Sequence, residues 1–114
     1  MDRFEACRLL DFYGPLLTPS RQSVLKLYLE EDLSLGEIAQ ETGITRQGVH
    51  DALQKAQRQL RGYEEKLGLV ARYRRIRKEV QGCRTQLAQV RVQPGSEAPL
   101  EKVVQALDRI EQTA

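Results

Sequence analysis

The sequence predicts an all-α protein in which a helix-turn-helix is followed by a long helical extension. Only 5% of the 114 residues are aromatic, none is Trp, and 30% are charged. This composition favours long helices over β-sheets. Apolar residues also recur at helical intervals along most of the chain. We expect one domain over residues 1–92, a linker over 93–99 and a C-terminal helix over 100–114.

Two short helices are predicted to come first. Residues 2–13 carry a broad apolar stripe, which ends before Pro15 because proline disfavours helical conformation in the residue that precedes it. Residues 19–30 form the second helix, with the Thr18 hydroxyl as its N-cap. Both helices should turn their apolar residues towards a shared core.

The next helix boundaries carry strong capping signals. Ser34 and Glu37 have the spacing of a capping box, so a third helix should begin after Ser34 and cover residues 35–42. Gly43 supplies the left-handed residue that turns the chain after a helix. Thr45 has the position of the N-cap of a fourth helix. Two helices joined by a three-residue turn are typical of a DNA-binding helix-turn-helix.

The apolar residues around this turn fit the same interpretation. Ile38 and Ala39 lie where the third helix would face the fourth, and the small side chain of Ala39 allows close approach. Ile44 is expected to fill the turn, while Val49 and Ala52 face back into the core. A plain helical corner with no DNA-binding role would show much the same pattern, and both interpretations remain open here.

A heptad seam follows and continues almost to the linker. Apolar residues alternate at intervals of four and three, and the phase shifts at Gly68, so we predict two long helices that break there. The seams could close on each other as a hairpin or against a second chain. The two series are Val49, Leu53, Ala56, Leu60, Tyr63, Leu67 and Val70, then Leu69, Tyr73, Ile76, Val80, Cys83, Leu87 and Val90.

We favour a homodimer formed through this region, because so few other groups are available to cover the seams. The contact should involve about residues 60–90, with Leu60, Leu67, Ile76 and Val80 as anchors. A two-fold dimer would also bring two helix-turn-helix units together, as symmetric DNA recognition requires. A dimer used only to dock a protein would look the same.

The charge is distributed unevenly. Residues 1–54 hold five basic and nine acidic residues, residues 55–91 hold eleven and three, and residues 92–114 hold two and four. The net charges are −4, +8 and −2. A basic middle between acidic ends suggests an anionic partner, most often nucleic acid. A solvated helical face is the alternative.

The first residues of the fourth helix are the candidate DNA-reading residues. Arg46 could bind guanine and Gln47 adenine, while Lys55 and Arg58 would contact phosphate. Asp51 argues against this, because a carboxylate is repelled by backbone phosphate, and Arg46 and Asp51 could instead pair with neighbouring side chains on a solvated helix. The candidate residues are Thr45, Arg46, Gln47, His50, Gln54, Lys55 and Arg58.

A second basic cluster lies on the helix after Gly68. Its side chains would form two basic edges, which suit RNA or DNA phosphates without reading sequence. They could equally be solubilising flanks that pair with Glu64, Glu65 or Glu79. The candidate phosphate-binding residues are Arg72, Arg74, Arg75, Arg77 and Lys78.

Longer stretches of sequence add a family resemblance. Residues 15–62, including Leu17-Thr18-Pro19 and Gly43-Ile44-Thr45, resemble region 4 of sigma-70-type factors. Over about residues 4–90, the segments Phe12 to Thr18, Thr45 to Asp51 and Gly62 to Leu69 resemble the YlxM-like family of small bacterial helix-turn-helix proteins. The resemblance implies a sigma region 4-like fold and a role in the signal recognition particle pathway. The extension over 93–114 lies outside it.

Other classes of protein are disfavoured. The chain has no phosphate-binding loop, no metal-type spacing of ligands and only one His, so we expect no enzyme, no cofactor and no metal. Cys7 and Cys83 are expected to be free, partly buried thiols. No apolar stretch approaches a membrane span and no export signal is visible, so we expect a cytoplasmic protein.

These observations favour a non-enzymatic, DNA-binding regulatory protein linked by resemblance to the signal recognition particle. The alternative is an accessory module of that particle, which binds a protein or RNA and has no sequence-specific DNA binding. In that case the helix-turn-helix is inherited architecture, and its acidic surroundings have removed the affinity for DNA.

Overall fold

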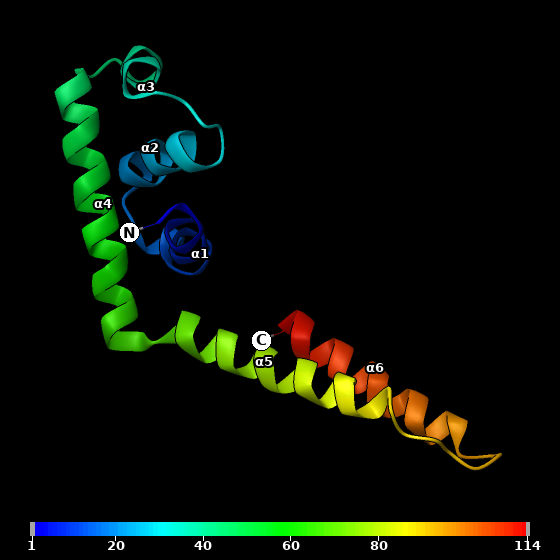
Figure 1. Ribbon diagram of the computed structural model, residues 1–114. Coiled ribbons are helices and arrows are strands. Elements are labelled where there is room, and N and C mark those ends of the chain that lie inside the picture. The colour runs from blue at the N-terminus through cyan, green and yellow to red at the C-terminus, as the bar shows by residue number, and fades with distance from the viewer. Residues whose placement is uncertain (1, 114) are drawn as a thin grey trace. The chain divides into compact units, whose positions relative to one another are not determined.

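The computed structural model describes residues 2–113, and all of its regular elements are helical, as predicted (Figure 1). The fold class is therefore confirmed. The elements are α1 (Arg3–Tyr13), the 3₁₀ turn η1 (Gly14–Leu16), α2 (Pro19–Leu29), α3 (Leu35–Thr42), α4 (Arg46–Leu67), α5 (Leu69–Leu87) and α6 (Glu97–Thr113).

The chain divides into two compact units, and the boundary falls between Val70 and Ala71 in the first turn of α5. The first unit contains α1 to α4, and the second contains the rest of α5 together with α6. The division into residues 1–92, 93–99 and 100–114 stays a prediction. Despite their similar heptad patterns, α4 packs on α1 to α3, whereas α5 pairs with α6.

In the first unit, α1, α2 and α3 lie one after another along α4 (Figure 1). Their apolar faces and one face of α4 make a single core, which also includes Val70. The fully buried residues include Leu25 on α2, Ile38 on α3 and Leu60 on α4. Burial of a side chain of this size is worth about 1.5–3 kcal/mol, so this core is the main source of stability for the unit.

This arrangement corrects two expectations about the seam of α4. Val49, Leu53, Ala56 and Leu60 are buried against α1 to α3, so the seam is already covered within the first unit. This seam is therefore not available to form a hairpin seam with the helix after Gly68. Leu60 cannot anchor a dimer either, because it is 0% exposed. The homodimer itself stays a prediction.

A partly buried polar network lies at the Gly68 end of the first unit. The Tyr13 hydroxyl donates to Oε1 of Glu64 at 2.5 Å and accepts the backbone N–H of Leu69 at 3.0 Å. The same Glu64 oxygen accepts the N–H of Val70 at 3.0 Å. Burial, and then the hydrogen bond to Glu64, raise the pKa of Tyr13, so the phenol stays neutral and donates. The network joins α1 to the end of α4 and to the start of α5.

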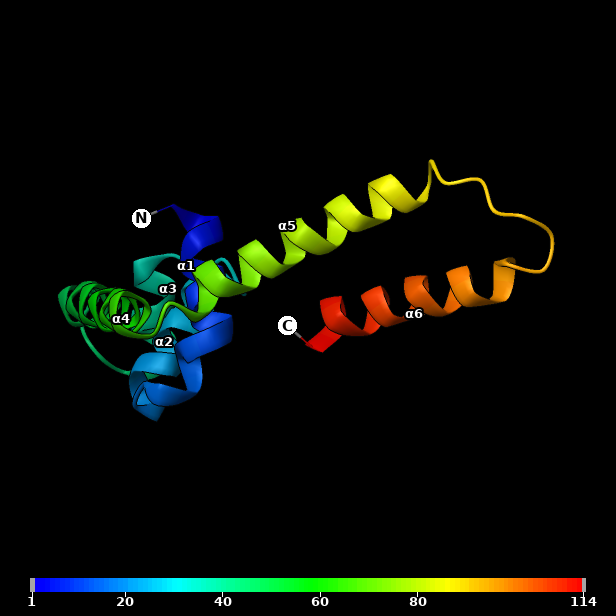
Figure 2. The same cartoon turned by 90° about the horizontal axis from the view of Figure 1, so that it is seen from below.

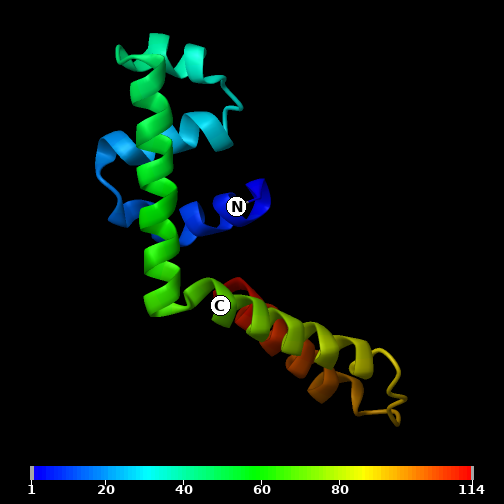
Figure 3. The ribbon, with the colours of Figure 1, turned by 60° about the vertical axis from the view of Figure 1, so that its left-hand side comes forward.

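In the second unit, α5 and α6 run side by side in opposite directions, as Figures 2 and 3 both show. One edge of this hairpin is held by charge. Arg84 on α5 forms ion pairs with Asp108 and with Glu111 on α6, the second at 2.5 Å. The Gln81 amide also donates to Glu111. The C-terminal segment is therefore the partner of α5, which the sequence did not reveal.

Three details of this unit differ from prediction. The last helix starts at Glu97, before the predicted residue 100, because Pro99 falls in the first turn, where no intrahelical N–H is needed. The preceding helix ends at Leu87, so Val90 lies beyond the seam and is exposed. Cys7 and Cys83 are both free, as predicted, but Cys83 is exposed instead of partly buried.

Within residues 2–113, no helix is both long enough and apolar enough to cross a lipid bilayer.

The Tyr13 network predicts a specific loss of stability. Replacing Tyr13 by Phe leaves the Leu69 N–H without its acceptor and removes a donor from Glu64. We expect the free energy of unfolding to fall by about 1–3 kcal/mol in urea titrations followed by circular dichroism. Tyr28→Phe is the matched control, because the Tyr28 hydroxyl makes no hydrogen bond within the described residues, and it should cost less than about 0.5 kcal/mol. Equal effects of the two variants would contradict this role.

The same residue predicts a dependence on alkaline pH. The pKa of Tyr13 in the folded chain lies above the ordinary tyrosine value of 10.0. Its contribution to the unfolding free energy is therefore complete below about pH 10 and is lost as the pH rises through the folded pKa. Tyr13→Phe lacks this term, so the difference in stability between wild type and variant should shrink above pH 10.

Candidate nucleic-acid interface

The helix-turn-helix begins with the capping box of α3. The Glu37 backbone N–H donates to the Ser34 hydroxyl at 3.1 Å, and the Ser34 N–H donates to the Glu37 carboxylate at 3.2 Å. Both interactions were predicted from the spacing of these two residues. They satisfy two backbone donors that the first turn of a helix leaves without partners. The start of α3 is therefore fixed locally by its own sequence.

The turn itself also forms as predicted. Gly43 adopts φ 74° and donates its N–H to the Ala39 carbonyl at 2.9 Å, which ends α3. The Thr45 hydroxyl then accepts the Gly48 N–H at 2.9 Å and starts α4. Ile38 on one helix and Val49 on the other are both 0% exposed. The two helices are thus joined by a short turn and clamped by apolar contact.

Ile44 is the exception in this turn. We predicted that it fills the space between the helices, but its side chain is 43% exposed. It lies beside Gly48, where its Cδ1 is 3.8 Å from the position that a Cβ would occupy. The core beneath the turn is already filled from the helices, so Ile44 remains an apolar group at the surface.

The predicted DNA-reading residues share an exposed surface, which we call the α4 face. All of them are exposed, and they project away from the side of α4 that carries the buried residues Val49, Leu53 and Ala56. Arg46 and Lys55 lie at its two edges, about 100° and 80° from Gln47. The α4 face comprises Thr45, Arg46, Gln47, His50, Asp51, Gln54, Lys55 and Arg58.

The acidic member of this face is held in a small network. The Gln47 side-chain amide donates to Asp51 at 3.1 Å, and Nδ1 of His50 lies 3.8 Å from the same carboxylate oxygen. Arg46, Lys55 and Arg58 form no salt bridge within residues 2–70. The alternative interpretation, in which Arg46 and Asp51 pair with neighbouring side chains, therefore holds for Asp51, whereas Arg46 forms no salt bridge in this unit.

A shallow cleft of about 380 Å³ lies where α3 and α4 begin, lined by Leu35, Arg46, Gln47 and His50. Sequence reasoning identified the α4 residues but missed Leu35, which follows the Ser34 cap. The only signal was its position as the first residue of α3. The cleft places guanidinium and amide donors and an imidazole beside an apolar wall, a combination that suits hydrogen bonding to base edges or phosphates.

The second predicted cluster lies on α5, in the other unit. All five of its side chains are exposed, and none forms a salt bridge within residues 71–113. Arg77 stacks over the Tyr73 ring at 5.8 Å and donates to its hydroxyl at 3.2 Å. The cluster comprises Arg72, Arg74, Arg75, Arg77 and Lys78.

Comparison with known proteins assigns the family. The model of the family described as "Putative helix-turn-helix protein, YlxM / p13 like" (UPF0122) matches residues 1–93. The chain belongs to this family. The match includes α1 to α5 and stops before α6. The YlxM-like resemblance seen in the sequence is thereby confirmed.

Individual proteins of the same family are also similar in sequence to this chain. The UPF0122 protein of Desulforamulus reducens is 53% identical over 74 residues, which cover 64% of this chain and 63% of that protein. The UPF0122 protein of Acetivibrio thermocellus is 51% identical over 74 residues, again with 64% and 63% coverage. That of Geobacillus kaustophilus is 37% identical over 103 residues, 90% of this chain and 91% of the relative. In the first two, the chain spans less than two thirds of the relative's length.

Substitutions at two glycines test the backbone conformation of this YlxM-like unit. An added Cβ would meet nothing within 4 Å at either Gly43 or Gly62, but only Gly43 has a positive φ. Gly43→Ala should lower the unfolding free energy by about 1–2 kcal/mol, because an L-residue is strained in this conformation. Gly62→Ala should raise it by about 0.5–1 kcal/mol, because Gly is a poor helix former. Urea titration measures both, and shifts of the same sign would contradict the turn geometry.

Proposed function

We propose that this protein binds duplex DNA through the α4 face and acts as a DNA-binding regulatory protein. The observation that carries the proposal is the presentation of α4: a clamped and capped helix-turn-helix holds its N-terminal half with every polar reading candidate exposed. In helix-turn-helix proteins, the second helix enters the major groove and its first residues meet the base edges.

The side chains on this face have complementary tasks. Arg46 can donate two hydrogen bonds to guanine, and the Gln47 amide can form two with adenine. Lys55 and Arg58 lie two to three turns further on, where they would contact backbone phosphates and set the register. Thr45, His50 and Gln54 complete the donors and acceptors on the face.

Charge both supports and limits the proposal. Between Arg46 and Arg61, α4 carries four basic residues and one acidic residue, Asp51. Phosphate neutralisation supplies most nucleic-acid affinity, so this helix is suited to it. The neighbouring α3 contributes exposed Glu37 and Glu41, which lower the affinity of the unit as a whole. We therefore expect modest, strongly salt-dependent binding.

The family resemblance also suggests the pathway in which the protein acts. We include in the proposal a role in the signal recognition particle pathway, on the basis of the resemblance of residues 4–90 to YlxM-like proteins. Membership of a helix-turn-helix family supports nucleic acid as the partner in that role.

Substitutions on the α4 face test DNA binding directly. Lys55→Ala should weaken binding to every duplex and reduce the salt dependence by about one released counterion. Arg46→Ala should cost about 1–3 kcal/mol, mainly on a preferred sequence selected from a random library. Fluorescence anisotropy at two salt concentrations measures both effects. Equal and weak binding of wild type and variants to all duplexes would refute the proposal.

A substitution at Asp51 should raise the affinity for DNA, in contrast to the two preceding variants. Asp51→Asn removes the one negative charge on the face and keeps an acceptor for the Gln47 amide. Because repulsion from phosphate is lost, affinity for any duplex should rise severalfold, with the largest gain at low salt. Glu65→Gln is the matched control, since Glu65 lies at the far end of α4. An unchanged affinity in Asp51→Asn would place DNA elsewhere on the unit.

A second candidate function is RNA binding through the basic cluster of α5. The observation that favours it is the exposure of all five side chains without ion pairs in their own unit. Such a surface contacts phosphates and ribose without reading sequence. It would support the alternative role as an accessory module of the signal recognition particle.

Charge reversal tests this candidate. Replacing Arg74, Arg75 and Arg77 by Glu should abolish binding to structured RNA in filter or anisotropy assays, because each lies off the apolar stripe. Helicity by circular dichroism should stay at the wild-type level, and binding to DNA through the α4 face should persist. Retained RNA binding in the folded variant would exclude this surface.

A further inference from the structure

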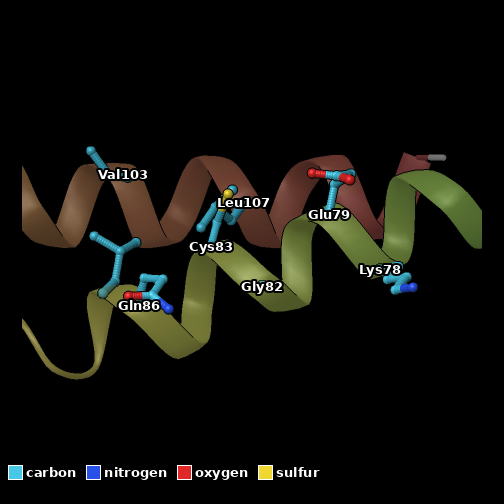
Figure 4. A pocket seen from close by; sticks show the side chains of 8 residues that line it. Lys78, Glu79, Gly82, Cys83, Gln86, Val103 and Leu107 are labelled. Atoms are coloured by element: carbon cyan, nitrogen blue, oxygen red, sulfur yellow. The ribbon is translucent and has the colours of Figure 1, made fainter.

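The second unit contains an apolar groove that borders the basic cluster of α5 and shares Lys78 with it. It has a volume of about 650 Å³ and runs between α5 and α6 (Figure 4). Cys83 and Leu87 line it from α5, and Val103 and Leu107 line it from α6. We call it the α5–α6 groove. Its walls are mainly apolar, so its interior does not suit a phosphate.

The groove is open because the ion pairs that join α5 to α6 lie on the other face of the hairpin. Gly82 and Gln86 line the groove, and Arg84 is two residues, about 200°, from each of them. The ion pairs of Arg84 with Asp108 and Glu111 therefore lie on the face opposite the groove. On the groove side, Val103 is 48% exposed, and Gly82 contributes no side chain that could fill the space.

The rim of the groove is basic. Lys78 lines it, and Arg75, three residues earlier on α5, shares the same face. Lys102 directly precedes Val103 on α6 and is exposed. Glu79 is the one acidic residue that lines the groove. The acidic side chains Asp108 and Glu111 are engaged on the opposite face, so they do not neutralise this rim.

We propose that the α5–α6 groove binds an acidic amphipathic helix of a partner protein. Apolar side chains at one edge of such a helix would enter the groove, as in other helix-in-groove complexes, and its flanking carboxylates would meet Arg75, Lys78 and Lys102. A second copy seated in the same groove is disfavoured, because it would bring two basic rims together. This inference is independent of the proposed DNA binding, which uses the other unit.

A synthetic peptide pair tests the proposal on the full chain, with no nucleic acid present. The first probe is a helix of about 20 residues with Leu at its a and d positions and Glu at the flanking positions. The second probe has Lys in place of every Glu. By fluorescence anisotropy, the acidic peptide should bind at least about tenfold more tightly than the basic twin. Equal affinities would refute the charge argument.

Two variants locate the site. Val103→Glu puts a charge into the groove and should reduce peptide affinity about tenfold or more, whereas Gln105→Glu adds the same charge on another side of α6 and should change it little. Gly82→Phe should block the groove; an added Cβ there meets no atom within 4 Å, and circular dichroism checks that the variant keeps its helicity. Peptide binding that survives both Val103→Glu and Gly82→Phe would overturn the assignment.

Thiol footprinting separates the possible occupants. Cys83 lines the groove and is exposed, so the acidic peptide should slow its alkylation by iodoacetamide, while Cys7 in the first unit should react at an unchanged rate. Mass spectrometry reports the two rates separately. Protection of Cys83 that rises with protein concentration alone would indicate a second copy. Protection by phosphatidylglycerol vesicles but not by the peptide would indicate a bilayer, and either result would overturn the proposal.

Discussion

Burial of one face of α4 is the constraint on which the first unit depends. The helices α1, α2 and α3 have 11, 11 and 8 residues. Isolated helices of fewer than about 12–15 residues are marginal in water, so each needs a wall to pack against. The 22-residue helix α4 supplies that wall. The same packing directs the opposite side of α4 to solvent, so a single constraint builds the core and presents the α4 face.

The two ends of α4 are fixed by different means. At the turn, the helix is held by its Thr45 cap and by an apolar core that includes Ile38 and Val49, and its polar side chains stay exposed. At the other end, the Tyr13 hydroxyl and Glu64 form a partly buried network with the first backbone N–H groups of α5. Among the described residues, every buried side-chain polar atom has a hydrogen-bond partner. The Tyr13–Glu64 hydrogen bonds that help to hold α4 therefore lie away from the α4 face.

The second unit is held together differently. Over its length α5 carries six basic residues and one acidic residue, whereas α6 carries four acidic and two basic residues. This asymmetry favours their pairing, but the ion pairs gather around Arg84 on one face. Two helices alone cannot enclose a core, so an apolar groove remains on the other face. The ion pairs of Arg84 join the two helices on one face, and the basic residues on the other face form the rim of the groove.

The sequence by itself determined the local features of this protein. The capping box of Ser34 and Glu37, the left-handed Gly43 and the Thr45 cap follow from short-range hydrogen bonds, so spacing alone predicts them. Helical periodicity likewise separates the buried seam of α4 from its exposed face. Each of these features depends on residues within about one or two turns of each other.

Tertiary structure decided what each apolar face packs against. The 4-3 pattern is the same in α4 and α5, yet three short helices cover the first and α6 pairs with the second. Periodicity reports which residues share a face and says nothing of what packs on it. For the same reason, the hydrogen bond between Tyr13 and Glu64 and the exposure of Ile44 and Cys83 could not be predicted. They depend on contacts between residues far apart in the chain, which only the folded core specifies.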